Sequence, residues 1–437
     1  MEKDGIWELI SSQKVIDTHE HLSLQSKICE EGANLLAILP RSYVGDFDFY
    51  PGLNAEYLQF QRGTSLENNE YPSITAFIRE FNDHEFLESI NSGIESIYDI
   101  PIKKMSESSF HALNEGINRN YHDACYYDTI LDEHMNVEKA ILDIPHSGLG
   151  LDNQKFEGFN SKKFYTSIRI NSLLFGFDTD AWTPSTSLMR RMQEDFKVIV
   201  ELPTDMNDFL EKTSKILEWT GDKVVSYKCA SAYERGLNFG PRKESLEGSK
   251  KYEISKKIYG KKFEKVSLDE RNAFGDVIFH HILDIIEKQG KTIQIHTGMA
   301  IMEGSNPKNL ENVFSSYPDL NFTLLHCGYP WIDETIEILK NHENVHAEMV
   351  WLQMLSKNAA RKFLDCVLDL NLEDKVIAFG GDCACIEGSL GALNILKQVL
   401  HDVFSSRIEK GKNKANDVET ILDRLLYENA NSLFFKK

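Results

Sequence analysis

Four histidines and one aspartate stand where they could bind a metal ion. His19 and His21 are separated by one residue, and residues i and i+2 of an extended strand point to the same face. Both imidazoles could therefore reach one ion at the ~2.0–2.1 Å that zinc–nitrogen bonds require. His296, His326 and Asp382 each follow a different apolar run. Taken separately, they are explained equally well by buried histidines with backbone partners or by an aspartate that caps a helix.

The elements that carry these residues are short β-branched runs, most of them nearly continuous in apolar residues. Such runs are typical of strands that are buried on both faces of a parallel sheet, and helix-like periodicity separates many of them. This alternation predicts an α/β fold. The predicted strands are Val15–Thr18, Glu138–Ile144, Tyr165–Ile170, Val224–Lys228, Thr292–His296, Asn321–His326, Asn344–Val350 and Val376–Gly380.

The positions of the histidines favour a (β/α)8 TIM barrel over a doubly wound open sheet. Four of the 14 histidines lie at the C-terminal ends of predicted strands, and in a barrel these ends converge around one axis. No repeat, low-complexity tract or linker divides the chain, so we expect a single domain over residues 1–437. We also expect a helical insertion over approximately residues 22–136, between the first and second strands, and a smaller one after the fourth strand.

The order of these residues resembles that of the amidohydrolase superfamily. The sequence has H-x-H after the first strand, histidine after the fifth and sixth, and aspartate after the eighth. The resemblance implies that His19, His21 and Asp382 bind the more buried divalent metal, with His296 as a further ligand. It also implies that Asp382 is the general base that takes a proton from the nucleophilic water.

Lys228 ends the fourth run, and the sequence leaves three interpretations of it open. In superfamily members with two metals a carboxylated lysine bridges the ions, and His296 and His326 would then hold the second ion. Otherwise the ammonium group binds a substrate carboxylate or forms a structural ion pair, because a dication repels an unpaired ammonium. The stretch from Lys228 to Leu237, with H-T-G and H-x-G-Y-P, resembles an amidohydrolase-related branch with many mononuclear members. We therefore expect one or two ions, with zinc first and manganese or iron as alternatives.

Other residues near the strand ends indicate the kind of substrate. Arginine and lysine side chains could form charge-assisted hydrogen bonds to a carboxylate, and aromatic side chains would exclude water from the site. The arginines could instead hold the βα loops in place. The candidate substrate-binding residues are Arg169, Tyr233, Arg235, Tyr329, Glu348 and Trp351.

These assignments lead to the hypothesis of a metal-dependent hydrolase for a small carboxylate-bearing amide, lactone or cyclic imide. A divalent ion lowers the pKa of water from 15.7 toward ~7 and polarises the scissile carbonyl. His326 would bind a second ion or stabilise the oxyanion. The alternative is a decarboxylase or uronate-type isomerase, since the superfamily contains both. The rival from another class is an inactive barrel that serves as a binding or assembly protein.

Composition excludes several classes of partner. The 437 residues include 48 basic and 68 acidic side chains, a formal charge of −20, which repels nucleic acid and anionic membranes. No window approaches the ~18 apolar residues of a membrane span, and the N-terminus carries no signal-peptide run. We expect a cytoplasmic enzyme that acts on a small molecule and whose seven cysteines are free thiols. Homo-oligomer formation is left open.

Overall fold

The computed structural model describes residues 3–44, 71–144, 159–179, 189, 192–193, 197–300 and 303–436. The chain divides into two compact units. Unit 1 comprises Met1–Leu142, Gly158–Phe164 and Met349–Ala430, and unit 2 comprises Asp143–Glu157, Tyr165–Glu348 and Asn431–Lys437. The expected single domain over residues 1–437 stays a prediction. No helix in the described ranges is long and apolar enough to span a membrane.

Eight strands form one sheet in the order in which they occur in the chain, which confirms the predicted barrel fold. Each of the eight predicted apolar runs overlaps one of these strands, although most of the boundaries differ by one to three residues. The strands are β1 (Val15–Glu20), β2 (Val137–Ile144), β3 (Phe164–Arg169), β4 (Ser226–Cys229), β5 (Thr292–His296), β6 (Phe322–Leu325), β7 (Val345–Glu348) and β8 (Val376–Ile377).

In unit 1, strand β1 connects its neighbour β2 to the segment that follows β8. It pairs with β2 in parallel, and on its other side the Thr18 N–H donates to the Phe379 carbonyl oxygen at 3.3 Å. The Asp382 N–H donates to the His19 carbonyl oxygen at 2.8 Å. All six residues of β1 are buried. One buried strand therefore carries the H-x-H pair and also fixes the backbone of Asp382.

Most of unit 1 is helical, including the described residues between β1 and β2. Whether these helices cover the mouth of the barrel stays a prediction. The α-helices are α1 (Lys3–Ser12), α2 (Gln25–Glu30), α3 (Leu35–Ile38), α5 (Tyr71–Glu80), α6 (Glu85–Tyr98), α7 (Glu107–Tyr121), α8 (Tyr126–Thr129), α15 (Leu352–Leu355), α16 (Lys357–Asp369), α17 (Ile386–Glu409) and α18 (Ala415–Asp423). The shorter or wider turns are η1 (Leu39–Ser42), η2 (Ile102–Lys104), η3 (Ile130–Met135), η11 (Glu373–Lys375) and η12 (Arg424–Glu428).

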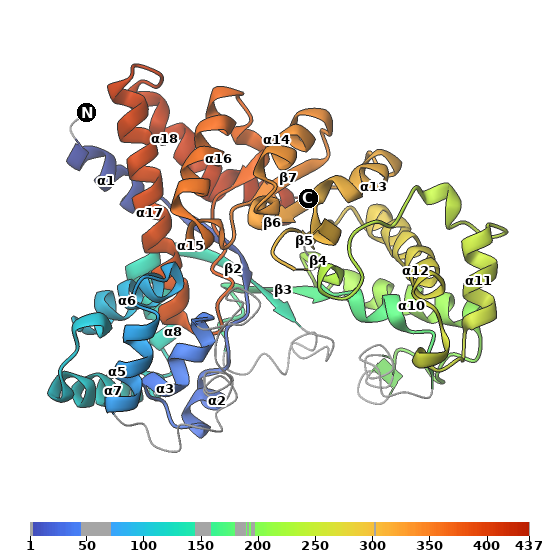
Figure 1. Cartoon of the computed structure of the whole chain (residues 1–437), viewed down its shortest axis with the longest axis horizontal. Helices are drawn as coiled ribbons and strands as arrows, with labels where there is room; N and C mark the ends of the chain where they lie inside the picture. The colour runs from blue at the N-terminus through green and yellow to red at the C-terminus, as the bar shows by residue number, and fades with distance from the viewer. Residues whose placement is uncertain are drawn as a thin grey trace. The chain divides into compact units, whose positions relative to one another are not determined.

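Helices α6 and α17 pack against each other in unit 1 (Figure 1). A Cβ atom on Gly93 would collide with the carbonyl oxygen of Glu387, and one on Gly391 would collide with that of Ser89. Glycine is therefore required on both helices, because their backbones approach too closely for any side chain.

Glu387, in the first turn of α17, strengthens this contact and joins two further helices to it. Its fully buried carboxylate accepts hydrogen bonds from the hydroxyls of Tyr98 at 3.1 Å, Tyr121 at 2.8 Å and Tyr126 at 2.8 Å. Loss of hydration raises the pKa of Glu387, and the three phenols act in the opposite direction. The start of α17 is thus tied to α6, α7 and α8.

Unit 2 contains strands β3 to β7, which pair in parallel. Helix α12 packs against both α10 and α11 (Figure 1). Ser267 and Glu270 form a capping box at its start, and Gly290 ends it in a left-handed conformation. The α-helices are α10 (Met206–Gly221), α11 (Lys250–Ile258), α12 (Leu268–Gln289), α13 (Glu311–Ser316) and α14 (Ile332–Asn341), and α19 (Asn429–Phe434) begins in unit 1 and ends in unit 2. The 3-10 helices are η4 (Asn171–Phe175), η5 (Ser231–Tyr233), η6 (Arg242–Glu244), η7 (Phe263–Lys265), η8 (Glu303–Ser305), η9 (Pro307–Leu310) and η10 (His326–Gly328).

All seven cysteines are free thiols, as the sequence predicts.

Candidate metal centre and substrate-binding residues

In unit 1, two imidazoles and one carboxylate come together at the end of β1. The Nε2 atoms of His19 and His21 lie 3.9 and 3.2 Å from Oδ1 of Asp382. The two imidazole rings are 5.0 Å apart and nearly perpendicular. His19 and Asp382 are buried, and the His21 side chain keeps 23% of its surface exposed. The strand alternation expected for H-x-H and the return of the chain after β8 together produce this cluster.

These three groups fit a divalent metal ion. Ligand atoms about 2.0–2.1 Å from a tetrahedral zinc ion are about 3.3 Å from one another. The distance from His21 to Asp382 is close to that value, and the distance from His19 to Asp382 is longer at 3.9 Å. Neutral imidazole nitrogen and carboxylate oxygen are both ordinary zinc ligands. His19, His21 and Asp382 could therefore hold one ion if His19 moves closer to Asp382.

Trp351 supports Asp382 from the loop after β7. Its indole Nε1–H donates to the Asp382 carbonyl oxygen at 3.0 Å, and its ring contacts those of Tyr43 and Phe86. Trp351 and Asp382 have φ angles of 63° and 47°, in the left-handed region that costs energy for residues other than glycine. The structure places this candidate substrate-binding residue against the backbone of the proposed base, and contact with substrate stays a prediction.

The sequence interpretation missed two buried acids in β1. Asp17 Oδ1 accepts hydrogen bonds from the His19 and Gly381 N–H groups at 3.2 and 3.1 Å, and Glu20 Oε2 accepts one from the Cys383 N–H at 3.0 Å. Burial raises the pKa of Asp17 to about 6 and also raises the pKa of Glu20. The two acids stand beside the histidines in D-T-H-E-H. However, Gly381 and Cys383, whose N–H groups donate to them, lie more than 360 positions further along the chain. Local spacing therefore gave no signal for them.

In unit 2, His296 and His326 face each other at the ends of β5 and β6. His326 Nε2 lies 3.0 Å from His296 Nδ1, and the ring of Tyr233 contacts that of His296. Burial lowers the pKa of His296 well below its usual value, and the charges of His326, Lys228 and Arg169 lower it further. Among the described residues, His296 Nε2 is buried without a hydrogen-bond partner. A neutral imidazole with a free nitrogen is suited to bind a metal ion or a substrate.

Two basic side chains stand side by side in the sheet next to these histidines. Lys228 in β4 is the register partner of Arg169 in β3, and only 2% of its surface is exposed. Arg169 forms an ion pair with the buried Asp143, a carboxylate that the sequence interpretation did not name. Carboxylation of Lys228 stays a prediction, as do its other two roles.

The remaining candidates have partners within unit 2. Glu348 is buried, and its carboxylate accepts hydrogen bonds from Thr323 Oγ1 and from Gln294 Nε2 at 3.1 and 3.2 Å. The Arg235 guanidinium lies 2.5 Å from Asp276 Oδ1 and over the ring of Phe239. The backbone N–H of Tyr329 donates to the His326 carbonyl oxygen at 3.0 Å. Their expected substrate contacts stay predictions.

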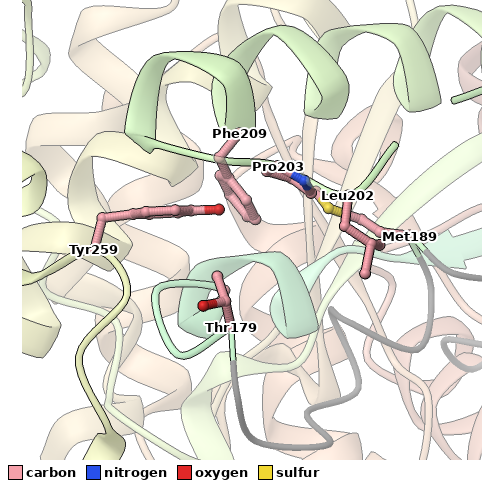
Figure 2. A pocket seen from close by; sticks show the side chains of 7 residues that line it. Thr179, Met189, Leu202, Pro203, Phe209 and Tyr259 are labelled. Carbon is pink, nitrogen blue, oxygen red and sulfur yellow. The ribbon is translucent and has the colours of Figure 1, made fainter. Parts of the chain in front are cut away.

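A mainly apolar pocket in unit 2 is lined by residues other than these candidates. Figure 2 shows the aromatic side chains of Phe209 and Tyr259 on its wall, together with Thr179, Met189, Leu202 and Pro203. Gly176 also lines it. None of the residues selected from the sequence belongs to this lining, so the pocket contains none of the groups assigned to the expected reaction.

Comparison with known proteins agrees with this fold. A family model described as amidohydrolase matches residues 263–436. Protein fluG of Emericella nidulans is 20% identical over 221 residues, which are 48% of this chain and 25% of fluG. The match thus spans about a quarter of the curated relative.

Three solved structures cover nearly the whole chain. Uronate isomerase from Thermotoga maritima has a TM-score of 0.72 at 15% identity and covers 99% of this chain and 97% of its own. Glucuronate isomerase from Caulobacter crescentus has a TM-score of 0.74 at 11% identity, with 100% and 94% covered. A protein described as a metal-dependent hydrolase from Lactobacillus casei has a TM-score of 0.65 at 13% identity, with 98% and 97% covered. At these identities the likeness concerns the fold.

Proposed function

We propose that this chain is a metal-dependent hydrolase of the amidohydrolase superfamily, whose family model matches residues 263–436. Its substrate is a small molecule with a carboxylate and an amide, lactone or cyclic imide bond. The supporting observation is the convergence of His19 and His21 on the carboxylate of Asp382 in unit 1. These three residues would hold a divalent ion, zinc first.

The chain's own groups would carry the proton transfers. A bound divalent ion supplies an activated water and polarises the carbonyl oxygen of the substrate. Asp382 accepts the proton of the attacking water at its carboxylate and passes it to the leaving group. The hydrogen bonds from Trp351 to the Asp382 carbonyl oxygen and from the Asp382 N–H to His19 keep that carboxylate in position.

Unit 2 would supply the groups that bind the substrate. Lys228 favours an anion because its ammonium group is cationic and buried, whereas the neighbouring Arg169 already pairs with Asp143. His296 remains neutral at pH 7 because its pKa is lowered, so it can accept a hydrogen bond or bind a metal.

An isomerase for a uronic acid is the second candidate. The uronate and glucuronate isomerases match the fold with TM-scores of 0.72 and 0.74, against 0.65 for the protein described as a hydrolase. The same cationic residue, Lys228, would bind the uronate carboxylate, and Asp382 would move a proton at carbon instead of taking one from water.

Substrate profiling tests the proposal. The purified chain is assayed with lactones, cyclic imides, N-acyl amino acids and uronic acids, beside His21→Ala and the control His134→Ala at an exposed position in the same unit. We expect turnover of a lactone, imide or amide by the native chain and the control only. Turnover of uronic acids alone would replace hydrolysis by isomerisation. No turnover by a zinc-loaded chain would favour the non-catalytic alternative.

Zinc binding gives a second test that needs no substrate. At a free zinc concentration 100 times the dissociation constant, binding stabilises the folded chain by about 2.7 kcal/mol. We expect a corresponding rise in melting temperature for the native chain and His134→Ala, and little or none for His21→Ala. An equal rise in all three would contradict the assigned ligands.

A further inference from the structure

Unit 2 contains a second pocket that combines charged and apolar side chains. Its lining comes from η4, the loop after η5, η7 and the first turns of α12. The lining residues are Phe175, Glu234, Arg235, Phe263, Leu268, Arg271 and Asn272. None of them is a proposed metal ligand.

Arg271 is a half-buried cation without an anionic partner among the described residues. Its guanidinium carbon lies 4.2 Å from the centre of the Phe263 ring, and its Nε–H is buried without a hydrogen-bond acceptor. The Nε–H of Arg235 in the same lining also lacks an acceptor, but its terminal nitrogens donate to Asp276 and to the carbonyl oxygens of Asn272 and Asn238. Burying a guanidinium donor without an acceptor is costly. Arg271 therefore lacks the anion that Arg235 already has.

Three other side chains of the lining are apolar and partly exposed. Phe263 and Leu268 keep 42% and 58% of their surfaces exposed, and Phe175 is half-buried. An apolar stem placed against these side chains would remove their surface from water, which is favourable. Since Arg271 stacks on Phe263, the anion site and the apolar wall are adjacent.

Glu234 limits how much negative charge the pocket accepts. Both of its carboxylate oxygens accept hydrogen bonds from Asn171 Nδ2, at 2.9 and 3.0 Å. Burial raises the pKa of Glu234, and the charge of Arg169 opposes this. Because Glu234 carries the same charge as an anionic ligand, it disfavours a second anionic group near it.

We propose that this pocket binds a monocarboxylate with an apolar stem, with Arg271 pairing with the carboxylate and Phe263 and Leu268 covering the stem. Glu234 directly follows Tyr233, whose ring contacts His296, so the pocket adjoins the strand-end residues of unit 2. The inference does not depend on the proposed hydrolysis, because no residue of the lining is a proposed metal ligand or proton acceptor and Arg235, a candidate substrate-binding residue, is not assigned to the monocarboxylate.

Calorimetric titration of the full chain with hexanoate, hexanamide and glutarate tests this inference. Hydrogen bonds to charged groups contribute about 1.5–3 kcal/mol, so hexanoate should bind roughly 10- to 100-fold more tightly than hexanamide. Glutarate should bind more weakly than hexanoate because its second carboxylate meets Glu234. Equal affinity for hexanoate and hexanamide, or no binding of hexanoate, would overturn the proposal.

Variants locate the binding to this pocket. Arg271→Gln should weaken hexanoate roughly 10- to 100-fold by the same estimate, whereas Arg119→Gln, at an exposed position in unit 1, should leave it unchanged. If Arg271→Gln does not fold, Leu268→Asn at an exposed position provides the same test through the apolar wall. His21→Ala must keep the native affinity, and a loss there would assign hexanoate to the metal centre and overturn the pocket. If hexanoate competes with a substrate that the chain turns over, the pocket binds substrate. If hexanoate changes kcat without competing, the pocket is regulatory.

Discussion

The strand-end residues of the two units use the same side-chain type in opposite electrostatic settings. In unit 1, His19 and His21 share a carboxylate, Asp382, so the group as a whole attracts a cation. In unit 2, His296 and His326 contact each other, and burial, together with the charges of His326, Lys228 and Arg169, lowers the pKa of His296. The difference shows that histidine at a strand end is not enough to define a metal site. The neighbouring charge decides which kind of ligand the imidazoles attract.

Removing the Asp382 carboxylate of unit 1 should have the largest effect on activity and metal content. Asp382→Asn loses both the proposed proton acceptor and one metal ligand, so kcat/KM should fall by about 10²- to 10⁴-fold or more. Elemental mass spectrometry should show less metal per chain, and His134→Ala should keep both properties. Native activity in Asp382→Asn would show that the unit 1 cluster is not the catalytic centre.

Removing the cation of unit 2 should affect substrate rather than metal. Lys228→Ala should raise KM by roughly 10- to 100-fold, because a charged hydrogen bond contributes about 1.5–3 kcal/mol. Metal content should stay near that of the native chain and of Lys243→Ala, a variant of an exposed lysine in the same unit. A fall from two ions to one would instead mean that Lys228 is a carboxylated metal ligand.

The support of Asp382 by Trp351 should have a smaller effect. Trp351→Phe keeps the ring contacts with Tyr43 and Phe86 but loses the 3.0 Å hydrogen bond to the Asp382 carbonyl oxygen. One such bond contributes about 1 kcal/mol, so zinc affinity should fall about fivefold in competition with a chromophoric chelator. Trp7→Phe, at a position 42% exposed in unit 1, is the matched control. An unchanged affinity in Trp351→Phe would make the indole N–H irrelevant to the metal site.

The smallest effect concerns a structural histidine of unit 2. Burial lowers the pKa of His280 from 6.5 to about 4, so the unfolded chain binds a proton more readily than the folded one. Well above pH 6.5 the imidazole is neutral in both the folded and the unfolded chain, so it causes no loss of stability. Between pH 6.5 and pH 4 only the unfolded chain takes up the proton, so the free energy of unfolding falls. Between pH 8 and pH 6 this loss is about 0.8 kcal/mol. Chemical denaturation should show a loss smaller by this amount in His280→Gln than in the native chain, since His296 contributes to the pH dependence of both, and equal pH dependence in both would contradict the assignment.

Much of the fold could be predicted because burial leaves a local trace. A strand that is covered on both faces must be apolar along its whole length, and Thr292–His296 was predicted with the bounds that the structure has. His19, His21 and Asp382 could be selected because each stands next to such a run. The braces around them could not, because Asp17 and Glu20 acquire their partners only when the segment after β8 returns to β1.

The sequence by itself determined the eight strands, their order and the polar residues at their ends, since apolar runs and their terminations are properties of neighbouring residues. Only the tertiary structure decided what each polar group contacts. Arg235 and Arg271 both line the second pocket of unit 2, yet Asp276 neutralises the first, and no described residue neutralises the second. An ion pair depends on which side chains lie within a few ångströms of each other. That proximity is set by packing between distant segments and leaves no pattern in the local sequence.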